Sequence, residues 1–215
     1  MPKAKNLPEH EPKQQRSRET LDRLLAATIK ILDEEGLEGA VIPKIAAAAK
    51  VAPASVYRRF VDKDALLRAA FLHMLRKSNE LNRELVGKAL LRKTLEESAV
   101  ELMNVLFDQY KRHPRLLRAS AKFLETDTDP DFSRDARLHV AENISLVVDA
   151  LLAFRVEIEH RFPRRALQFA VLTAASAIEG YALEPSSMWH VMAPVSEKEL
   201  KAELARTFVA YLRHR

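Results

Sequence analysis

The sequence of 215 residues contains no cysteine and only 4 glycines. The lack of cysteine excludes disulfides and thiolate sites, and it fits a reducing compartment. Scarce glycine and abundant alanine, leucine, arginine and glutamate favour helix along nearly the whole chain. No apolar run approaches the length of a membrane span, and the segment MPKAKNLPEHEPKQQ lacks the apolar part of a signal peptide. We therefore expect a soluble, all-α, cytoplasmic protein that does not contact a membrane.

Motifs of catalysis are also missing, because the sequence has neither a Gly-rich phosphate loop nor a G-x-S-x-G motif. Glu157 and His160 form an E-x-x-H motif, but a di-iron site needs a second copy and two further glutamates. DTDPD resembles the start of a calcium loop, yet Phe132 and Leu138 stand where that loop needs glycine and a bidentate glutamate. We expect no enzyme, cofactor or metal. A helical metalloenzyme is a remote alternative that metal analysis would test.

Hydrophobic residues make up 47% of the chain and charged residues 30%, so we expect it to fold. The formal net charge is +5, which only hints at an anionic partner. The position of the charge is more informative. Residues 41–63 hold five cations and a single anion, Asp62, a local net charge of +4.

Cap and turn residues divide the first part of the chain into short helices. We expect residues 1–15 to form a disordered basic arm. Such an arm would either reach the minor groove of a bound duplex or add only general affinity for nucleic acid. A first helix is capped by Ser17 and ends at Gly36. A second, short helix is followed by a third that begins at Pro53, and Asp62 caps a fourth, longer one. Three helices within so few residues, the last two joined by a tight turn, predict a helix-turn-helix.

The rest of the chain contains further amphipathic segments and no strand signal, so we expect about nine helices in total. We assign residues 16–62 to a helix-turn-helix domain and 63–215 to a second, C-terminal helical domain. The helix that begins at residue 62 connects the two.

The third helix, in VAPASVYRRF, combines an apolar side with a row of hydrogen-bond donors. In a helix-turn-helix this second helix of the motif enters the major groove, and Lys, Arg, Tyr and Ser side chains bind phosphates. Lys63 is disfavoured by the dipole of the fourth helix, a conflict that a bound phosphate would resolve. The alternative is a solvated basic face on an ordinary helical domain. The predicted DNA-binding residues are Lys44, Pro53, Ala54, Ser55, Tyr57, Arg58, Arg59 and Lys63.

The segment GLEGAVIPKIAAAAKVAPASVYRRFVDKDALLRAAF resembles the DNA-binding segment of the tetracycline-repressor (TetR) family. The resemblance covers roughly residues 17–71, and the remainder agrees only in class and length. It implies that Ser55, Tyr57, Arg58, Arg59 and Lys63 contact DNA, with Lys44 as a flanking contact. It also implies a homodimer that binds a near-palindromic double-stranded operator and releases it when a small ligand binds the C-terminal domain.

Three residues depart from the pattern of that family. Val41 stands where Thr or Ser is usual, so the second helix loses a side-chain cap, at a cost of about 1 kcal/mol. Lys50 replaces the turn glycine, and Ala52 stands where Ser is common. We expect Lys50 to adopt the left-handed conformation, which costs roughly 1 kcal/mol for a residue with a Cβ.

Two C-terminal helices are candidates for the dimer interface. The helix that starts at Pro163 is apolar on nearly all sides, and the last helix carries an apolar stripe. Two such helices from each subunit would form a four-helix interface, although both could instead close a monomeric core. The predicted interface residues are Leu167, Ala170, Val171, Ala174, Ile178, Leu200, Leu204, Phe208 and Tyr211.

A ligand pocket is harder to place, because methionine and aromatic residues at helical spacing also form plain core. Their polarity suggests an apolar or amphipathic ligand, and Trp189 either gates an entrance or anchors a loop. The predicted pocket residues are Met103, Phe107, Tyr110, Phe123, Asn143, Val147 and Trp189.

These observations favour a ligand-responsive, homodimeric transcriptional repressor. The alternative is a DNA-binding protein of the same fold with an architectural role or a protein partner, and without a small-molecule inducer.

Overall fold

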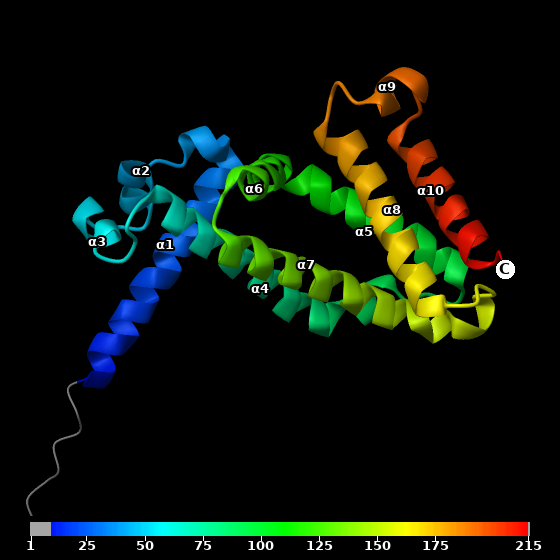
Figure 1. The fold of residues 1–215 in the computed structure, drawn as a ribbon, viewed down its shortest axis with the longest axis horizontal. Helices are drawn as coiled ribbons and strands as arrows, with labels where there is room; N and C mark the ends of the chain where they lie inside the picture. Colours follow the sequence, from blue (N-terminus) through cyan, green and yellow to red (C-terminus); the bar gives the residue numbers. More distant parts are fainter. Residues whose placement is uncertain (1–9, 215) are drawn as a thin grey trace, which may run out of the picture.

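The computed structural model describes residues 10–214. Within that range all regular secondary structure is helical, in ten α-helices and one short 3-10 helix joined by loops. The all-α prediction is therefore confirmed (Figure 1). The helices are α1 (His10–Gly39), α2 (Ile42–Ala48), α3 (Pro53–Tyr57), α4 (Lys63–Leu90), α5 (Leu95–Arg112), α6 (Pro114–Thr126), α7 (Pro130–Leu151), η1 (Leu152–Glu157), α8 (Pro163–Leu183), α9 (Met188–Met192) and α10 (Glu197–Leu212). The short α9 lies where the sequence predicted only a loop.

The first helix begins earlier than predicted. Residues 10–15, which we had assigned to a disordered arm, are the start of α1. Pro12 is tolerated because it lies in the first turn, where backbone N–H groups have no helical partner. The remaining arm residues, 1–9, lie outside the described range. Gly36 interrupts α1 with φ 73°, a left-handed conformation that glycine adopts without steric cost.

Side-chain caps start several helices. The Asp62 carboxylate accepts a hydrogen bond from the Ala65 N–H at 2.7 Å, which confirms the predicted cap of α4. Asp129 caps α7, and Ser196 forms a reciprocal capping box with Glu199 at the start of α10.

Buried apolar side chains form two separate cores. The C-terminal core contains residues from the end of α4 and from α5, α7, η1, α8 and α10. The N-terminal core holds together α1, α2, α3 and the first turns of α4, which we call the head. The domain boundary predicted at residue 62 misses part of this core, because α6 and the start of α7 also belong to it. They contribute Leu116, Ala119, Phe123, Phe132 and Ala136.

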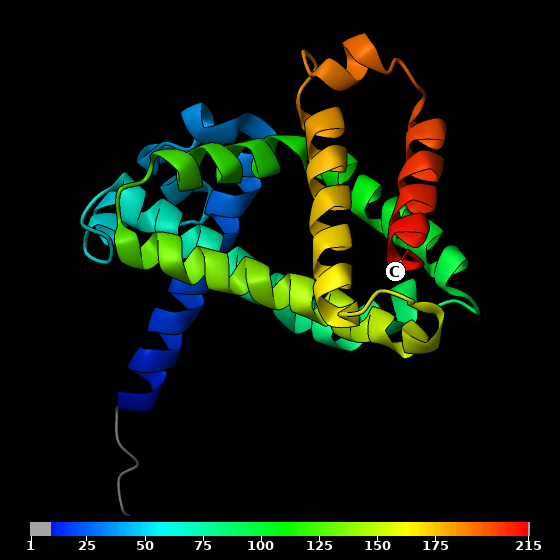
Figure 2. The same cartoon turned by 45° about the vertical axis from the view of Figure 1, so that its right-hand side comes forward.

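Helices α4 and α7 lie side by side and connect the two cores (Figures 1 and 2). Between them Asn79, which is 1% exposed, donates hydrogen bonds to the His139 carbonyl at 2.9 Å and to the Glu142 carboxylate at 2.8 Å. Asn143 in turn donates to the Asn79 side-chain oxygen at 3.0 Å. Since buried polar groups must be paired, this network fixes the register of α4 against α7.

Helices α8 and α10 run in opposite directions at the far end of the molecule from the head (Figures 1 and 2). Contrary to our expectation, α8 is long and apolar enough to cross a membrane by length and composition, with a mean hydropathy of 1.3 over its most apolar window. One face of α8 is apolar because it packs against α5, α7 and α10. Only 44% of the window is buried within the chain, so much of the apolar surface remains outside.

Candidate DNA-binding surface

The inner side of the helix-turn-helix is anchored in the N-terminal core. Ile45, Ala46 and Val56 are completely buried, while Val51 and Phe60 are half-buried and pack against the same core. The apolar side predicted for the segment VAPASVYRRF is thus confirmed. This anchoring fixes the direction in which the other side of α3 points.

The turn between α2 and α3 adopts the predicted conformation. Lys50 has φ 58°, in the left-handed region, and the Val51 N–H closes the turn by donating to the Ala46 carbonyl at 2.9 Å. Val41 and Ala52 precede α2 and α3 without any side-chain cap, as their apolar side chains require. The turn is therefore built with a strained residue and two uncapped helix starts.

The outer side of α3 is exposed. Tyr57 is 58% exposed, and Arg58 and Arg59 are also exposed. The Arg58 guanidinium donates to the Ser55 hydroxyl at 2.9 Å, which aligns these two predicted DNA-binding side chains. The remaining predicted contacts on this helix, Pro53 and Ala54, are exposed at its leading end.

The other two predicted cations interact within the chain. Lys44 forms an ion pair with Glu35 of α1. The Lys63 ammonium donates to the Leu37 carbonyl at 3.2 Å, near the end of α1, where a positive charge is favoured. This hydrogen bond offsets part of the conflict between Lys63 and the dipole of its own helix.

The motifs that resemble metal sites have structural roles. Glu157 accepts a hydrogen bond from the Leu95 N–H at 3.4 Å and pairs with Arg213 at 3.3 Å, while His160 packs on the Tyr211 ring. DTDPD forms the turn between α6 and α7. Among the described residues no cluster of three or more His, Cys, Asp or Glu side chains is arranged to hold a metal.

The predicted pocket residues do not come together. Met103 and Phe107 are buried in the C-terminal core, with Tyr110 and Val147 packed against it, whereas Phe123 belongs to the N-terminal core. Burial raises the pKa of Tyr110 to about 12, so its hydroxyl remains a hydrogen-bond donor at neutral pH.

Asn143 and Trp189, the other two predicted pocket residues, also make contacts within the chain. Asn143 is part of the polar network between α4 and α7. The Trp189 ring lies next to Gly180, whose missing Cβ would sit 3.5 Å from it. Trp189 therefore anchors α9 to α8.

The predicted interface residues mostly face inward. Only Leu204 and Tyr211 are half-buried and reachable, and the other members of the set are buried within this chain: Leu167, Ala170, Val171, Ala174, Ile178, Leu200 and Phe208. The exposed apolar side chains of α8 are instead Phe169 and Leu172, which were not predicted. Because α8 is apolar on nearly all sides, its sequence did not predict which side packs against the rest of the same chain.

Residues 24–70 match the family model described as "Bacterial regulatory proteins, tetR family". Over 101 residues, 47% of this chain, the sequence is 35% identical to the HTH-type transcriptional repressor DrrR1 of Streptomyces coeruleorubidus, and this stretch covers 35% of that protein. The chain spans less than half the length of the curated relatives it matches.

Solved structures share the fold over nearly the whole chain. A putative TetR-family transcriptional regulator from Mesorhizobium loti has a TM-score of 0.65 at 18% identity, over 92% of this chain and 96% of that one. The transcriptional regulator FadR from Bacillus subtilis, in complex with stearoyl-CoA, has a TM-score of 0.59 at 16% identity, over 89% and 96%. The matched family consists of transcriptional regulators rather than enzymes. The N-terminal segment 24–70 therefore has the helix-turn-helix of the tetR family of bacterial regulatory proteins, and the chain as a whole has the fold of a putative TetR-family regulator.

Proposed function

We propose that this protein is a homodimeric, sequence-specific DNA-binding transcriptional repressor that acts in the cytoplasm. The observation that carries the proposal is the exposed outer side of α3 and of the turn that follows it. There Tyr57, Arg58 and Arg59 are exposed, while the inner side of the helix is buried in the head. Arginine can form two hydrogen bonds with guanine in the major groove, and tyrosine and arginine bind phosphates. The name of DrrR1, a transcriptional repressor, supports repression.

Dimerisation is proposed because one short helix reads too few bases. Two copies related by a two-fold axis would place two recognition helices about 34–36 Å apart, in successive major grooves. The free apolar side of α8 and α10 is a suitable interface. Phe169 is 59% exposed and Leu172 49% exposed, and an apolar groove of about 120 Å³ runs between the two helices. This groove is lined by Phe169, Ala170, Thr173, Ala174, Leu204, Thr207, Phe208 and Tyr211.

This surface revises the predicted interface. Ala170, Ala174 and Phe208 belong mainly to the core of their own chain but form the floor of the groove, while Phe169 and Leu172 supply its exposed rim. A second copy that inserts its own Phe169 into this groove would cover the apolar part of α8 that the single chain leaves open.

A small apolar or amphipathic ligand is proposed to release the DNA. Support comes from the relative of the same fold that binds stearoyl-CoA and from the aromatic side chains that gather near α9. A ligand can shift the equilibrium only if it binds the DNA-free state more tightly. The burial of Met103 and Phe107 and the separation of Phe123 from them favour the second candidate, a DNA-binding protein without a small-molecule inducer.

Selection of bound sequences from a random duplex pool tests the proposal. Enrichment of a short inverted repeat, with half-sites about one helical turn apart, is expected for a dimeric sequence reader. If no motif is enriched, and if the affinity for DNA falls steeply as the salt concentration rises, the result would contradict sequence-specific repression and support an architectural role. Once an operator is known, long-chain acyl-CoA can be added to the complex of protein and DNA. Release of the DNA would support the ligand-responsive repressor over the protein without an inducer.

A further inference from the structure

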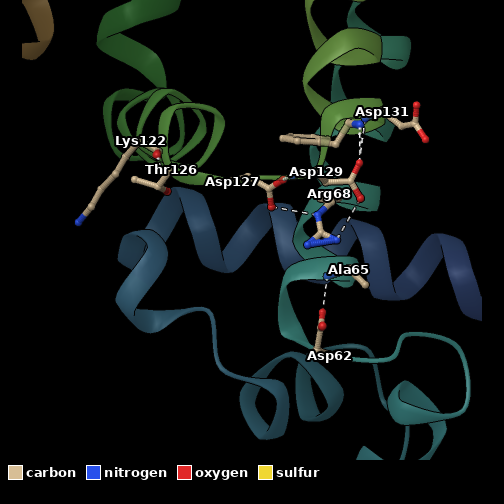
Figure 3. Close-up of polar contacts among 9 residues, drawn as sticks. Asp62, Ala65, Arg68, Lys122, Thr126, Asp127, Asp129 and Asp131 are labelled. Atoms are coloured by element: carbon tan, nitrogen blue, oxygen red, sulfur yellow. Dashed lines mark hydrogen bonds and ion pairs between the residues drawn. The ribbon is translucent and has the colours of Figure 1, made fainter.

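The turn between α6 and α7 is joined to the head by a partly buried cluster of charges (Figure 3). Arg68, near the start of α4, donates from Nε to Asp127 at 2.9 Å, and a second guanidinium nitrogen lies 3.5 Å from Asp129. The Asp127 side chain is only 3% exposed and that of Arg68 26% exposed. Because the Asp127 carboxylate is removed from solvent, its charge needs the guanidinium in one place, and the pair acts as a geometric constraint.

Both carboxylates of the cluster are fully used. Asp127 accepts from Arg68 with one oxygen and from the Asp129 N–H, at 2.9 Å, with the other. One oxygen of Asp129 accepts from the Asp131 and Phe132 N–H groups and so caps α7, while the other faces Arg68. The guanidinium is thereby tied to the first turn of α7, and not only to a loop.

A cluster of three aromatic rings reinforces the same contact between the head and the rest of the chain. The Phe123 ring, on α6, lies 5.3 Å from Phe71 of α4 and 5.5 Å from Phe132 of α7. On its other side α6 is held against α1, where His113 contacts Asp33 at 2.8 Å and Lys122 pairs with Glu38 at 3.5 Å. The head is thus fixed to the rest of the chain through α6 and the start of α7 as well as through the connector α4.

We infer that Arg68, Asp127 and Asp129 are positioning residues that set the angle of the head relative to the C-terminal domain, and through it the half-site spacing that the dimer accepts. This inference rests on the proposed function. None of the three side chains lies on the exposed face of α3, so they act on the geometry between two heads and not on the contacts of one head with DNA. The distance between two reading helices decides which operators fit.

The experiment compares three duplexes that carry the half-site selected by the wild-type protein: a single half-site, two half-sites at the selected spacing, and two half-sites moved apart by a few base pairs. Asp127→Asn is the main variant, because it keeps the size of the side chain while it removes the charge and one of the two acceptor oxygens that bind Arg68 and the Asp129 N–H. Arg68→Gln is the second. Arg134→Gln is the matched control, since Arg134 forms similar pairs with Asp131 and Asp135 on the exposed side of α7.

We expect both variants to lower the preference for the selected spacing by roughly 3- to 30-fold, the range of measured couplings between separate sites. Binding to the single half-site should stay within about twofold of wild type, as for independent sites. Arg134→Gln should leave both quantities unchanged. Circular dichroism identifies a variant that does not fold. In that case the spacing preference of the other variant tests the inference.

Three results would overturn the inference. An unchanged spacing preference in the variants rejects the positioning role alone. A loss of single half-site binding equal to the loss at the selected spacing shows that the cluster merely stabilises the head. Failure of the wild-type protein to select any motif refutes the proposed function itself, before any variant is compared, and the inference with it.

Discussion

The Arg59 guanidinium donates a hydrogen bond to the Ser17 hydroxyl at 3.1 Å, although the two residues are 42 positions apart in the sequence. This contact ties the residues just beyond α3 to the early part of α1. It holds an exposed cation beside the proposed DNA-reading side of the head, where we expect a phosphate of the flanking backbone to replace the hydroxyl as its partner.

Replacement of Arg59 by alanine should weaken binding to every DNA sequence. The loss of one phosphate contact in each subunit flattens the dependence of log affinity on log salt by about two units per dimer. Titrations at several salt concentrations measure this slope. Lys198→Ala, which removes an exposed cation at the start of α10, is the control and should leave the slope unchanged.

Arg58→Ala should have a different effect, because its guanidinium is aligned by Ser55 on the outer side of α3. The variant is expected to lose discrimination at particular base pairs, by about 1–3 kcal/mol for each, while it retains most of its non-specific affinity. Repeating the duplex selection with the variant checks this. An unchanged motif would exclude Arg58 as a base-reading residue.

Phe169→Glu should dissociate the dimer. The side chain is largely exposed in the single chain, so the variant should fold, but two buried charges in a two-fold interface would each cost about 2 kcal/mol or more. Sedimentation equilibrium should then find a single chain under conditions in which we expect the wild-type protein to form the proposed dimer. Leu81→Glu replaces another exposed apolar residue, on α4, and should remain dimeric.

Lys50→Gly should stabilise the protein. The left-handed backbone of Lys50 strains any residue with a Cβ, and glycine relieves that strain, for a net gain of roughly 0.5–1 kcal/mol. The free energy of unfolding in urea measures the change. Ala48→Gly, within α2, provides the opposite control, with an expected loss of about 1 kcal/mol. Lower stability of Lys50→Gly would mean that the lysine side chain contributes more than the strain costs.

Stability should fall as the pH drops through the range just below 6.5. Burial, with Arg76 nearby, lowers the pKa of His73 from its ordinary 6.5, so the unfolded chain binds a proton that the folded chain resists. The free energy of unfolding should change by at most about 1.4 kcal/mol per pH unit in this range, and His73→Gln should remove this dependence. Carboxylates such as Glu142, whose pKa Arg83 lowers from 4.5, act only at lower pH. Equal slopes for variant and wild type would contradict this assignment.

The head could be predicted from sequence because its signals are local. Pro53 and Asp62 begin helices with their own chemistry, and the spacing of Val56 among its neighbours identifies the buried side within a few residues. The Arg68–Asp127 pair gave no such signal, since 59 residues separate its members. The only local hint was that DTDPD fitted no calcium loop and so left its carboxylates without an assigned role.

The placement of α6 shows the same limit from another side. Its apolar residues Leu116, Ala119 and Phe123 predict one buried face, but periodicity does not say which core that face will join. For α8 the difficulty is reversed, because a helix that is apolar on all sides does not disclose which side its own chain covers. The buried Leu167 and the exposed Phe169 are equally apolar in sequence.

The contribution of α6 and the start of α7 to the N-terminal core has a consequence for synthesis on the ribosome. The head cannot complete its core when residue 71 has emerged, because Leu116, Phe123 and Ala136 are not yet available. Until then the newly made helices expose the apolar surface that those residues later cover, a state in which nascent chains tend to aggregate. For the same reason a fragment cut after α4 would lack part of its interior, so the smallest unit able to fold as a head is discontinuous in sequence.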